Sequence, residues 1–268
     1  MGIVLSSGDS FTYGDELPGS RNPEGLRFDT HHHHTFTHKL SEKLGKEYVN
    51  IGRNGSSNMK IFRRTMDNIM LHGPDNIDLL MVTWSNFGRF EICEPFKFHD
   101  DKVVFIHSES NMNQIIPDQH ATHMELRYAG PIPERERILK EYVRNVLTHH
   151  TQVFHALNFM TQIQWICDQL NIPVIQGVIH GDMYINYLHT LQRNDDWKDY
   201  KHEAILKYRM LREECRIGFG VYKDIYFTGV DNGHKVFPMG HVDENAHTDY
   251  ANMLYDIIKD KELLDVTD

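Results

Sequence analysis

The stretch at residues 77–84 reads IDLLMVTW and contains one charged residue, Asp78. A run that is apolar at nearly every position, and not only at every second one, is typical of a parallel strand covered on both faces. It predicts a parallel strand whose sheet carries helices on both sides.

Strand-like and helical patterns alternate on both sides of this stretch. Before it, we predict strands near 3–7 and 48–51, a helix over 36–44 and a second helix that begins at Ser57 or Asn58. After it, we predict strands at 172–179 and 225–227, a helix over 199–216 and an amphipathic helix that carries Tyr250, Leu254, Ile257 and Ile258. This alternation predicts an α/β fold with a mostly parallel five-stranded sheet.

The regular alternation stops after Trp84. Residues 90–133 mix aromatic residues, prolines and short β-like runs such as 103–106, which indicates an insertion or lid. Residues 134–170 show a long helical pattern. We therefore predict one domain, 1–268, with a large insertion and a long helical region over 90–170.

The composition excludes several classes of protein. The 268 residues are 40% hydrophobic and 25% charged, which is typical of a globular protein. A formal net charge of −10 disfavours nucleic-acid binding, and no apolar run approaches the roughly 20 residues that span a bilayer. The first residues lack the features of a secretory signal, so we expect a cytoplasmic protein. Three cysteines without a CxxC motif indicate neither a disulfide framework nor a structural zinc site.

Several residues that could carry chemistry follow the predicted strands. Ser10, after the first strand and close to Gly8, is either an exposed nucleophile or a helix cap, and the local pattern favours neither. Gly55 and Asn86 follow the second and third strands, where they could donate N–H groups to a ligand or belong to ordinary turns. His241 lies just before the last helix, where it could act as a general base, although a lone histidine is more often structural.

Taken together and in this order, these residues resemble the sequence blocks of the SGNH hydrolases, also called the GDSL esterase/lipase family. Gly8-Asp9-Ser10, followed by Phe11-Thr12-Tyr13-Gly14, resembles the first block. Gly55, Asn86 and His241 lie where the second, third and last blocks would place their glycine, asparagine and histidine. The resemblance spans almost the whole chain and implies a three-layer α/β/α sandwich of flavodoxin-like type.

The resemblance also implies an activity. The chain would be a serine-dependent ester hydrolase that acts on a small or carbohydrate-linked acyl ester, through an acyl-enzyme and without a cofactor. Ser10 would be the nucleophile and His241 its base. The N–H groups of Ser10 and Gly55 and the side chain of Asn86 would form the oxyanion hole.

Three further residues are candidates for substrate binding. They are Asp9 in the first block and Arg89 and Glu91, which closely follow the third. For Arg89 and Glu91 an internal ion pair is the other interpretation, and on general grounds the more frequent one.

The acid that supports the histidine is not where the family usually has it. The family's aspartate stands three residues before the histidine, and Pro238 occupies that position here. Asp231 and Asp243 are the alternatives by proximity in sequence, and we assign Asp243. Another register makes His247 the base, with Glu244 three residues before it.

A second function remains open. Trp84 stands where the third block usually has a glycine, and together with Pro238 it suggests a catalytically weak binding or assembly protein on the same fold. The apolar long helical region would suit a homodimer interface or a core equally well.

Histidine is unusually frequent, with 19 residues and a run from His31 to His34. The run could bind a transition metal, which leaves a metallohydrolase as a third interpretation. It has no carboxylate or cysteine at useful spacing, and the sequence has no HExxH motif. We therefore predict no metal site.

Overall fold

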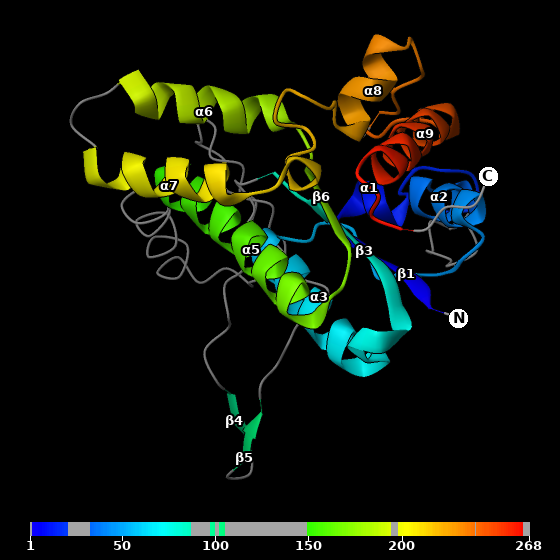
Figure 1. Ribbon diagram of the computed structural model, residues 1–268, viewed down its shortest axis with the longest axis horizontal. Coiled ribbons are helices and arrows are strands. Elements are labelled where there is room, and N and C mark those ends of the chain that lie inside the picture. Colours follow the sequence, from blue (N-terminus) through cyan, green and yellow to red (C-terminus); the bar gives the residue numbers. More distant parts are fainter. Residues whose placement is uncertain are drawn as a thin grey trace.

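A computed structural model places the chain in three layers, a parallel sheet between two layers of helices (Figure 1). It describes residues 2–20, 33–86, 97–99, 102–104, 149–193, 198–238 and 240–264. The sheet consists of four parallel strands in the order β2-β1-β3-β6. These are β1 (Ile3–Gly8), β2 (Glu47–Asn50), β3 (Ile77–Trp84) and β6 (Val174–Val178). The predicted α/β class, the layered architecture and these four strands are confirmed.

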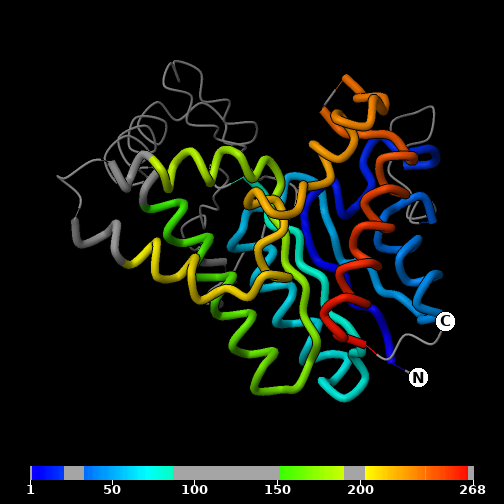
Figure 2. The backbone as a smooth tube through the Cα atoms, turned by 45° about the horizontal axis from the view of Figure 1, so that its top comes forward, coloured from blue at the N-terminus to red at the C-terminus, as the bar shows by residue number. Residues whose placement is uncertain are grey.

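Strand β3 is buried because helices cover both of its faces. Leu80 and Val82 point into a core shared with α3 (Asn58–His72) and α5 (His149–Leu170). Leu79 and Met81 belong to the opposite core, together with residues of α2 (Phe36–Leu44) and α9 (Glu244–Asp260). Figure 2 shows α2 (blue) and α9 (red) side by side on this side of the sheet. Successive side chains of a strand point to opposite faces, so a strand between two cores is apolar throughout.

Local capping sets the helix boundaries that the sequence predicts. The Thr35 hydroxyl accepts a hydrogen bond from the His38 N–H at the start of α2, and α2 ends at Gly45 in the left-handed region, at φ +62°. The Ser57 hydroxyl accepts from the Lys60 N–H at the start of α3. Side-chain caps satisfy N–H groups that have no acceptor within the first turn of a helix.

The remaining elements connect and extend these layers. They are α1 (Ser10–Tyr13), α6 (Gly181–Arg193), α7 (Lys198–Met210), α8 (Ile225–Asp231), the short 3₁₀ helices η2 (Pro74–Asn76) and η4 (Glu213–Cys215), and a hairpin of β4 (Lys97–His99) and β5 (Lys102–Val104). Helix α7 packs against α5, and α8 packs against α9 (Figure 1). Helix α6 is absent from the sequence prediction, and the predicted helix over 199–216 is shorter, ending at Met210.

The predicted fifth strand at 225–227 is wrong, because these residues begin α8. The Asp224 carboxylate accepts a hydrogen bond from the Phe227 N–H and caps the helix. Ile225 is buried in the core beneath α9. Beyond β6 the sheet gains a single parallel bridge, between Gly177 and Ile217.

The region predicted as an insertion is described in part. Helix α5 belongs to a core layer of the fold, and β5 coincides with the start of the predicted β-like run at 103–106. Residues 105–148 lie outside the described residues, so the insertion and the single-domain boundaries stay predictions. In the part of the chain that the structure describes, no helix has both the length and the apolar character needed to cross a bilayer.

The carboxyl ends of the four strands meet at one edge of the sheet. Gly8 at the end of β1 lies beside Thr83 of β3, and Trp84 lies beside Val178 of β6. The Arg53 N–H, after β2, donates to the Gly8 carbonyl at 3.1 Å. The segments that follow the strands are thereby held side by side, where open α/β sheets bind their ligands.

Candidate active site

Ser10 is the first residue of the one-turn helix α1 and follows β1 after a single residue. That residue, Asp9, caps the helix by accepting a hydrogen bond from the Phe11 N–H at 3.1 Å. The turn ends at Gly14, in the left-handed region at φ +83°. Ser10 is 4% exposed, and its N–H stands where a helix provides no internal acceptor. The turn therefore presents a hydroxyl and a backbone donor at the edge of the sheet.

Gly8 allows this turn to pack closely. A Cβ at this position would collide with the Thr12 side chain and would lie 2.9 Å from the Thr83 carbonyl oxygen. Any larger residue would displace the turn that carries Ser10, which gives a packing reason for the glycine in the first block.

Asp9 connects the turn that carries Ser10 to the residue after β3 through buried hydrogen bonds. It is buried, and its second carboxylate oxygen accepts a hydrogen bond from the Ser85 hydroxyl at 2.9 Å. Asp9 thus joins the turn after β1 to the end of β3. The substrate contact that we predicted for Asp9 from its place in the first block stays a prediction.

His241 packs against the turn that carries Ser10. Its ring centroid lies 4.9 Å from that of Phe11, the residue after Ser10. Its Nδ1 lies 2.8 Å from Oε2 of Glu16, and the two side chains are only 8% and 14% exposed. A carboxylate accepts hydrogen bonds, so Nδ1 carries the proton of the neutral ring and Nε2 is the basic nitrogen.

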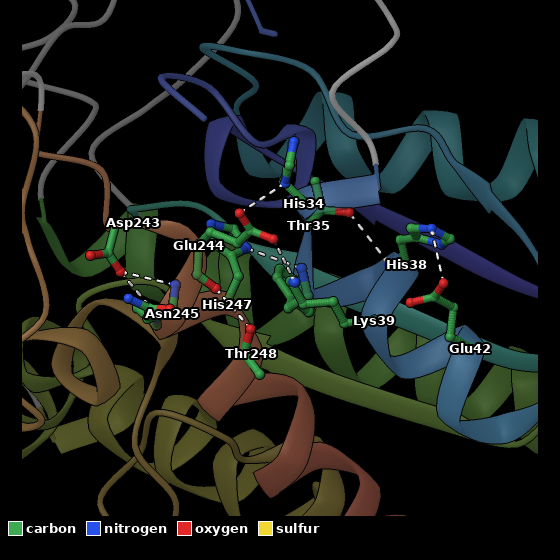
Figure 3. Close-up of polar contacts among 12 residues, drawn as sticks. His34, Thr35, His38, Lys39, Glu42, Asp243, Glu244, Asn245, His247 and Thr248 are labelled. Carbon is green, nitrogen blue, oxygen red and sulfur yellow. Dashed lines mark hydrogen bonds and ion pairs between the residues drawn. The ribbon is translucent and has the colours of Figure 1, made fainter. Parts of the chain in front are cut away.

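The acid predicted from the sequence, Asp243, lies elsewhere. It is the N-cap of α9, and its Oδ1 accepts hydrogen bonds from the N–H groups of Asn245 and Ala246, at 3.0 and 3.1 Å (Figure 3). Glu16 instead occupies the position beside His241. Nothing in the local sequence marks Glu16 for this position, because 225 residues separate it from the histidine.

The alternative register, with His247 as the base, does not fit the structure. His247 is buried, and its Nδ1 accepts a hydrogen bond from the Phe36 N–H at 3.1 Å. Burial lowers the pKa of His247 to about 3, so the ring is an uncharged acceptor at neutral pH. Glu244 forms ion pairs with Lys39 at 2.8 Å and His34 at 2.9 Å (Figure 3).

The other two predicted N–H donors follow β2 and β3, the strands on either side of β1, at the same end of the sheet. Gly55 lies in the left-handed region at φ +67°, and a Cβ built there meets nothing within 4 Å among the described residues. The Asn86 Nδ2 donates to the Met183 thioether sulfur at 3.3 Å. A thioether is a weak acceptor, so a developing oxyanion would bind this amide more strongly.

A buried network that the sequence analysis missed fixes the chain just before Asn86. The Ser85 N–H donates to Asn58 Oδ1 at 2.8 Å, and the Tyr184 hydroxyl donates to the Ser85 carbonyl at 2.8 Å. The Asn58 Nδ2 donates to the Tyr184 hydroxyl at 3.1 Å, which closes the network. Residues of α3 and α6 thus hold the chain just after β3, and this fixes the backbone from which the Asn86 side chain extends.

Trp84 contributes its whole side chain to the core. It is fully buried, and its Nε1 donates to Gln176 Oε1 at 2.9 Å. Its ring stacks on Phe159 of α5, with centroids 6.4 Å apart. The residue that departs from the family's glycine therefore fills the layer beneath α5.

Some predicted residues remain untested by the structure. Arg89 and Glu91 lie outside the described residues, as do His31 and His32. Within the described ranges, no group of three or more His, Cys, Asp or Glu side chains is arranged to hold a metal ion.

Cys215 is a buried free thiol, and burial raises its pKa to about 12.

No protein-family model and no curated protein matches the sequence. Among solved structures, the chain is similar to a member of the lipolytic protein G-D-S-L family from Veillonella parvula DSM 2008, with 12% identity, coverage of 97% of this chain and 99% of that chain, and a TM-score of 0.47. It is also similar to the psychrotrophic esterase EstA from Pseudoalteromonas sp., with 9% identity, coverage of 98% and 99%, and a TM-score of 0.46. A third similar structure is the acetylxylan esterase Axe2 from Geobacillus stearothermophilus, with 9% identity, coverage of 97% and 94%, and a TM-score of 0.43. These structural matches to G-D-S-L lipolytic proteins and esterases extend over nearly the whole chain.

Proposed function

We propose that this protein is a serine-dependent ester hydrolase, with Ser10 as nucleophile and His241 as general base. One observation carries the proposal: Phe11, the residue after a buried serine at the start of α1, packs against a buried histidine whose Nδ1 is bound to a carboxylate. The motif resemblance in the sequence points to the same two residues. A histidine bound at Nδ1 directs its basic Nε2 toward a nucleophile in this class of site.

The first half of the reaction forms an acyl-enzyme. The Ser10 Oγ attacks the carbonyl carbon of the ester, and its proton passes to Nε2 of His241. The carbonyl oxygen becomes the oxyanion of a tetrahedral intermediate. When this intermediate collapses, the bond to the alcohol oxygen breaks and His241 returns the proton to the departing alcohol.

The second half restores the enzyme. His241 takes a proton from water, and the resulting hydroxide attacks the acyl carbon bound to Ser10. Collapse of the second intermediate releases the carboxylic acid and returns the proton to Ser10. In both halves the oxyanion would be held by the N–H groups of Ser10 and Gly55 and by the Asn86 amide.

A protein that binds its ligand without turnover is the second candidate function. One observation favours it: the Asn86 amide donates to the Met183 sulfur, so one of its two N–H groups is already engaged. The two candidates differ in whether Ser10 is chemically activated.

Labelling with a fluorophosphonate, read by intact mass, tests this difference. We expect a single adduct on the wild type, no adduct on Ser10→Ala and slow labelling of His241→Ala. Ser6→Ala is the matched control, because Ser6 is buried in β1 and its hydroxyl has no hydrogen-bond partner among the described residues. Equal labelling of the wild type and Ser10→Ala would exclude Ser10 as the nucleophile.

The substrate is proposed as a small or carbohydrate-linked acyl ester. A panel of p-nitrophenyl esters of increasing acyl length, together with an O-acetylated oligosaccharide, compares these classes directly. Release of acetate from the oligosaccharide that is lost in Ser10→Ala would support a carbohydrate ester. Hydrolysis restricted to the long-chain esters would contradict a small acyl group.

A further inference from the structure

We propose that Glu16 is the residue that positions His241. The acid of the site would then come from the segment that follows Ser10, and not from the loop that precedes His241. This inference rests on the proposed esterase function. It assigns a role to a side chain that the sequence pattern does not indicate.

The loop before His241 has no carboxylate available for this role among its described residues. Pro238 occupies the position three residues before the histidine. The loop is closed on itself, since the Phe237 N–H donates to the His241 carbonyl at 2.7 Å. The nearest acids in the sequence have other partners: Asp231 pairs with Lys223 at 2.8 Å, and Asp243 caps α9.

The backbone at Glu16 adopts a conformation that non-glycine residues rarely take. Its φ is +66°, in the left-handed region. Hydrogen bonds on either side hold the segment, from the Leu17 N–H to the Gly14 carbonyl and from the Ser20 N–H to the Leu17 carbonyl, at 3.3 and 2.9 Å. Leu17 is itself buried in the core. Strained residues held in this way concentrate at functional sites, and here the strained residue is the one whose carboxylate meets His241.

The same turn carries the nucleophile and the acid. The Ser10 carbonyl accepts hydrogen bonds from the N–H groups of both Gly14 and Asp15, each at 2.9 Å. Glu16 is the next residue, so its position is tied to that of Ser10 by the backbone of one short turn. His241, 225 residues after Glu16 in the sequence, contacts this segment through Phe11 and Glu16.

Because it is buried, the Glu16–His241 pair can control the tautomer and the charge of the histidine more strongly than an exposed pair can. The Glu16 and His241 side chains are 14% and 8% exposed, whereas another histidine–carboxylate pair of similar length, His234 with Asp249 at 2.7 Å, is 20% and 37% exposed. In a poorly hydrated site the carboxylate fixes the neutral tautomer of the histidine. It also stabilises the imidazolium that forms when the histidine accepts a proton.

Two variants of Glu16 test the proposal. Glu16→Gln removes the charge and can place an N–H against Nδ1, which fixes the wrong tautomer; we expect kcat to fall by about 10²–10⁴ with KM within about threefold. Glu16→Gly removes the carboxylate and relieves the left-handed backbone, so we expect the same loss of kcat without a loss of thermal stability. Asp249→Asn, the matched surface control, should keep the wild-type kcat.

Proton NMR gives a second readout that does not depend on turnover. An imidazole N–H bound to a carboxylate resonates far downfield, and the His241→Asn variant identifies that signal. We expect the signal in the wild type and in Asp249→Asn, and its loss in Glu16→Gln and Glu16→Gly.

The outcomes separate this proposal from the proposed function. Wild-type kcat in Glu16→Gln or Glu16→Gly, in a protein whose labelling still depends on Ser10 and His241, would overturn the role of Glu16 alone. A less stable Glu16→Gly that keeps its kcat would show a merely structural ion pair. Absence of both labelling and ester hydrolysis in the wild type would overturn the esterase function and this inference with it.

Discussion

His247 of α9 is buried against α2, and the loss of hydration lowers the pKa of its imidazole from 6.5 to about 3. The positive charge of Lys39, and that of His241 in its protonated form, also lower this pKa, whereas Asp243 and Glu244 raise it by a smaller amount. Protonation would in addition remove the acceptor that Nδ1 offers to the Phe36 N–H. Between pH 6.5 and 3, His247 therefore binds a proton more weakly in the folded protein than in the unfolded chain.

The size of the effect follows from this difference in pKa. Between pH 6.5 and 3 the unfolded chain binds one more proton at His247 than the folded protein does, so the free energy of unfolding decreases as the pH falls. The slope is about 1.4 kcal/mol per pH unit, and the full contribution of about 5 kcal/mol is present above pH 6.5 and lost by about pH 3. Between pH 7 and pH 5 the loss assigned to His247 is about 2 kcal/mol.

Urea unfolding at pH 7 and pH 5, followed by circular dichroism, measures this loss. His247→Asn is the informative variant, because its side-chain oxygen can accept from the Phe36 N–H but does not titrate. We expect the wild type to lose about 2 kcal/mol more than His247→Asn over this range, whereas the other titrating groups contribute to both proteins and cancel. An equal loss in the two proteins would refute the reasoning.

Three further predictions concern the core and the site. Trp84→Phe leaves Gln176 Oε1 without its buried donor and should lower the free energy of unfolding by about 1–3 kcal/mol, measured in urea; an unchanged midpoint would contradict that role for the hydrogen bond. Gly181→Ala places a methyl group on the Gly218 carbonyl and should destabilise by at least about 1 kcal/mol, so an unaltered melting temperature would count against this close approach. Asn86→Ala should reduce kcat for ester hydrolysis by about 10²–10³, and wild-type turnover in that variant would remove Asn86 from the oxyanion hole.

Much of the fold can be predicted from the sequence because short-range chemistry determines it. Thr35, Ser57 and Gly45 mark helix ends through hydrogen bonds and backbone conformations that lie within a few residues of each position. The apolar run over 77–84 predicts a strand with the bounds that the structure shows, because burial on both faces affects every residue of the run.

The errors arise where distant contacts decide the structure. The run at 225–227 is rich in residues that favour strands, yet it forms a helix that packs against α9. Helix α6 begins at Gly181, whose N–H donates to Asp224, a partner 43 residues away. Tyr184 and Leu188, four residues apart and both buried, are the signal by which this helix could have been predicted.

Some residues of the candidate site could likewise be predicted from the sequence, whereas others became evident only from the structure. Ser10 and His241 stand in sequence blocks that resemble those of a known family, and the structure packs His241 against Phe11, the residue after Ser10. The partner of His241 leaves no local pattern, because Glu16 reaches it only through a left-handed turn and the docking of the far end of the sequence. The network of Ser85, Asn58 and Tyr184 likewise joins segments that are distant in the sequence.

Helix α9 covers one face of the sheet, where it packs with elements from the first fifty residues. Tyr250 of α9 packs edge-on against Phe36 of α2, with ring centroids 5.0 Å apart, and Leu254 and Ile258 share their core with Val4 of β1. A nascent chain on the ribosome must therefore hold this apolar face open until α9 has left the exit tunnel. During that interval β1 has been synthesised, but its apolar face is not yet covered by α9. Exposed apolar surfaces of this kind are bound by molecular chaperones.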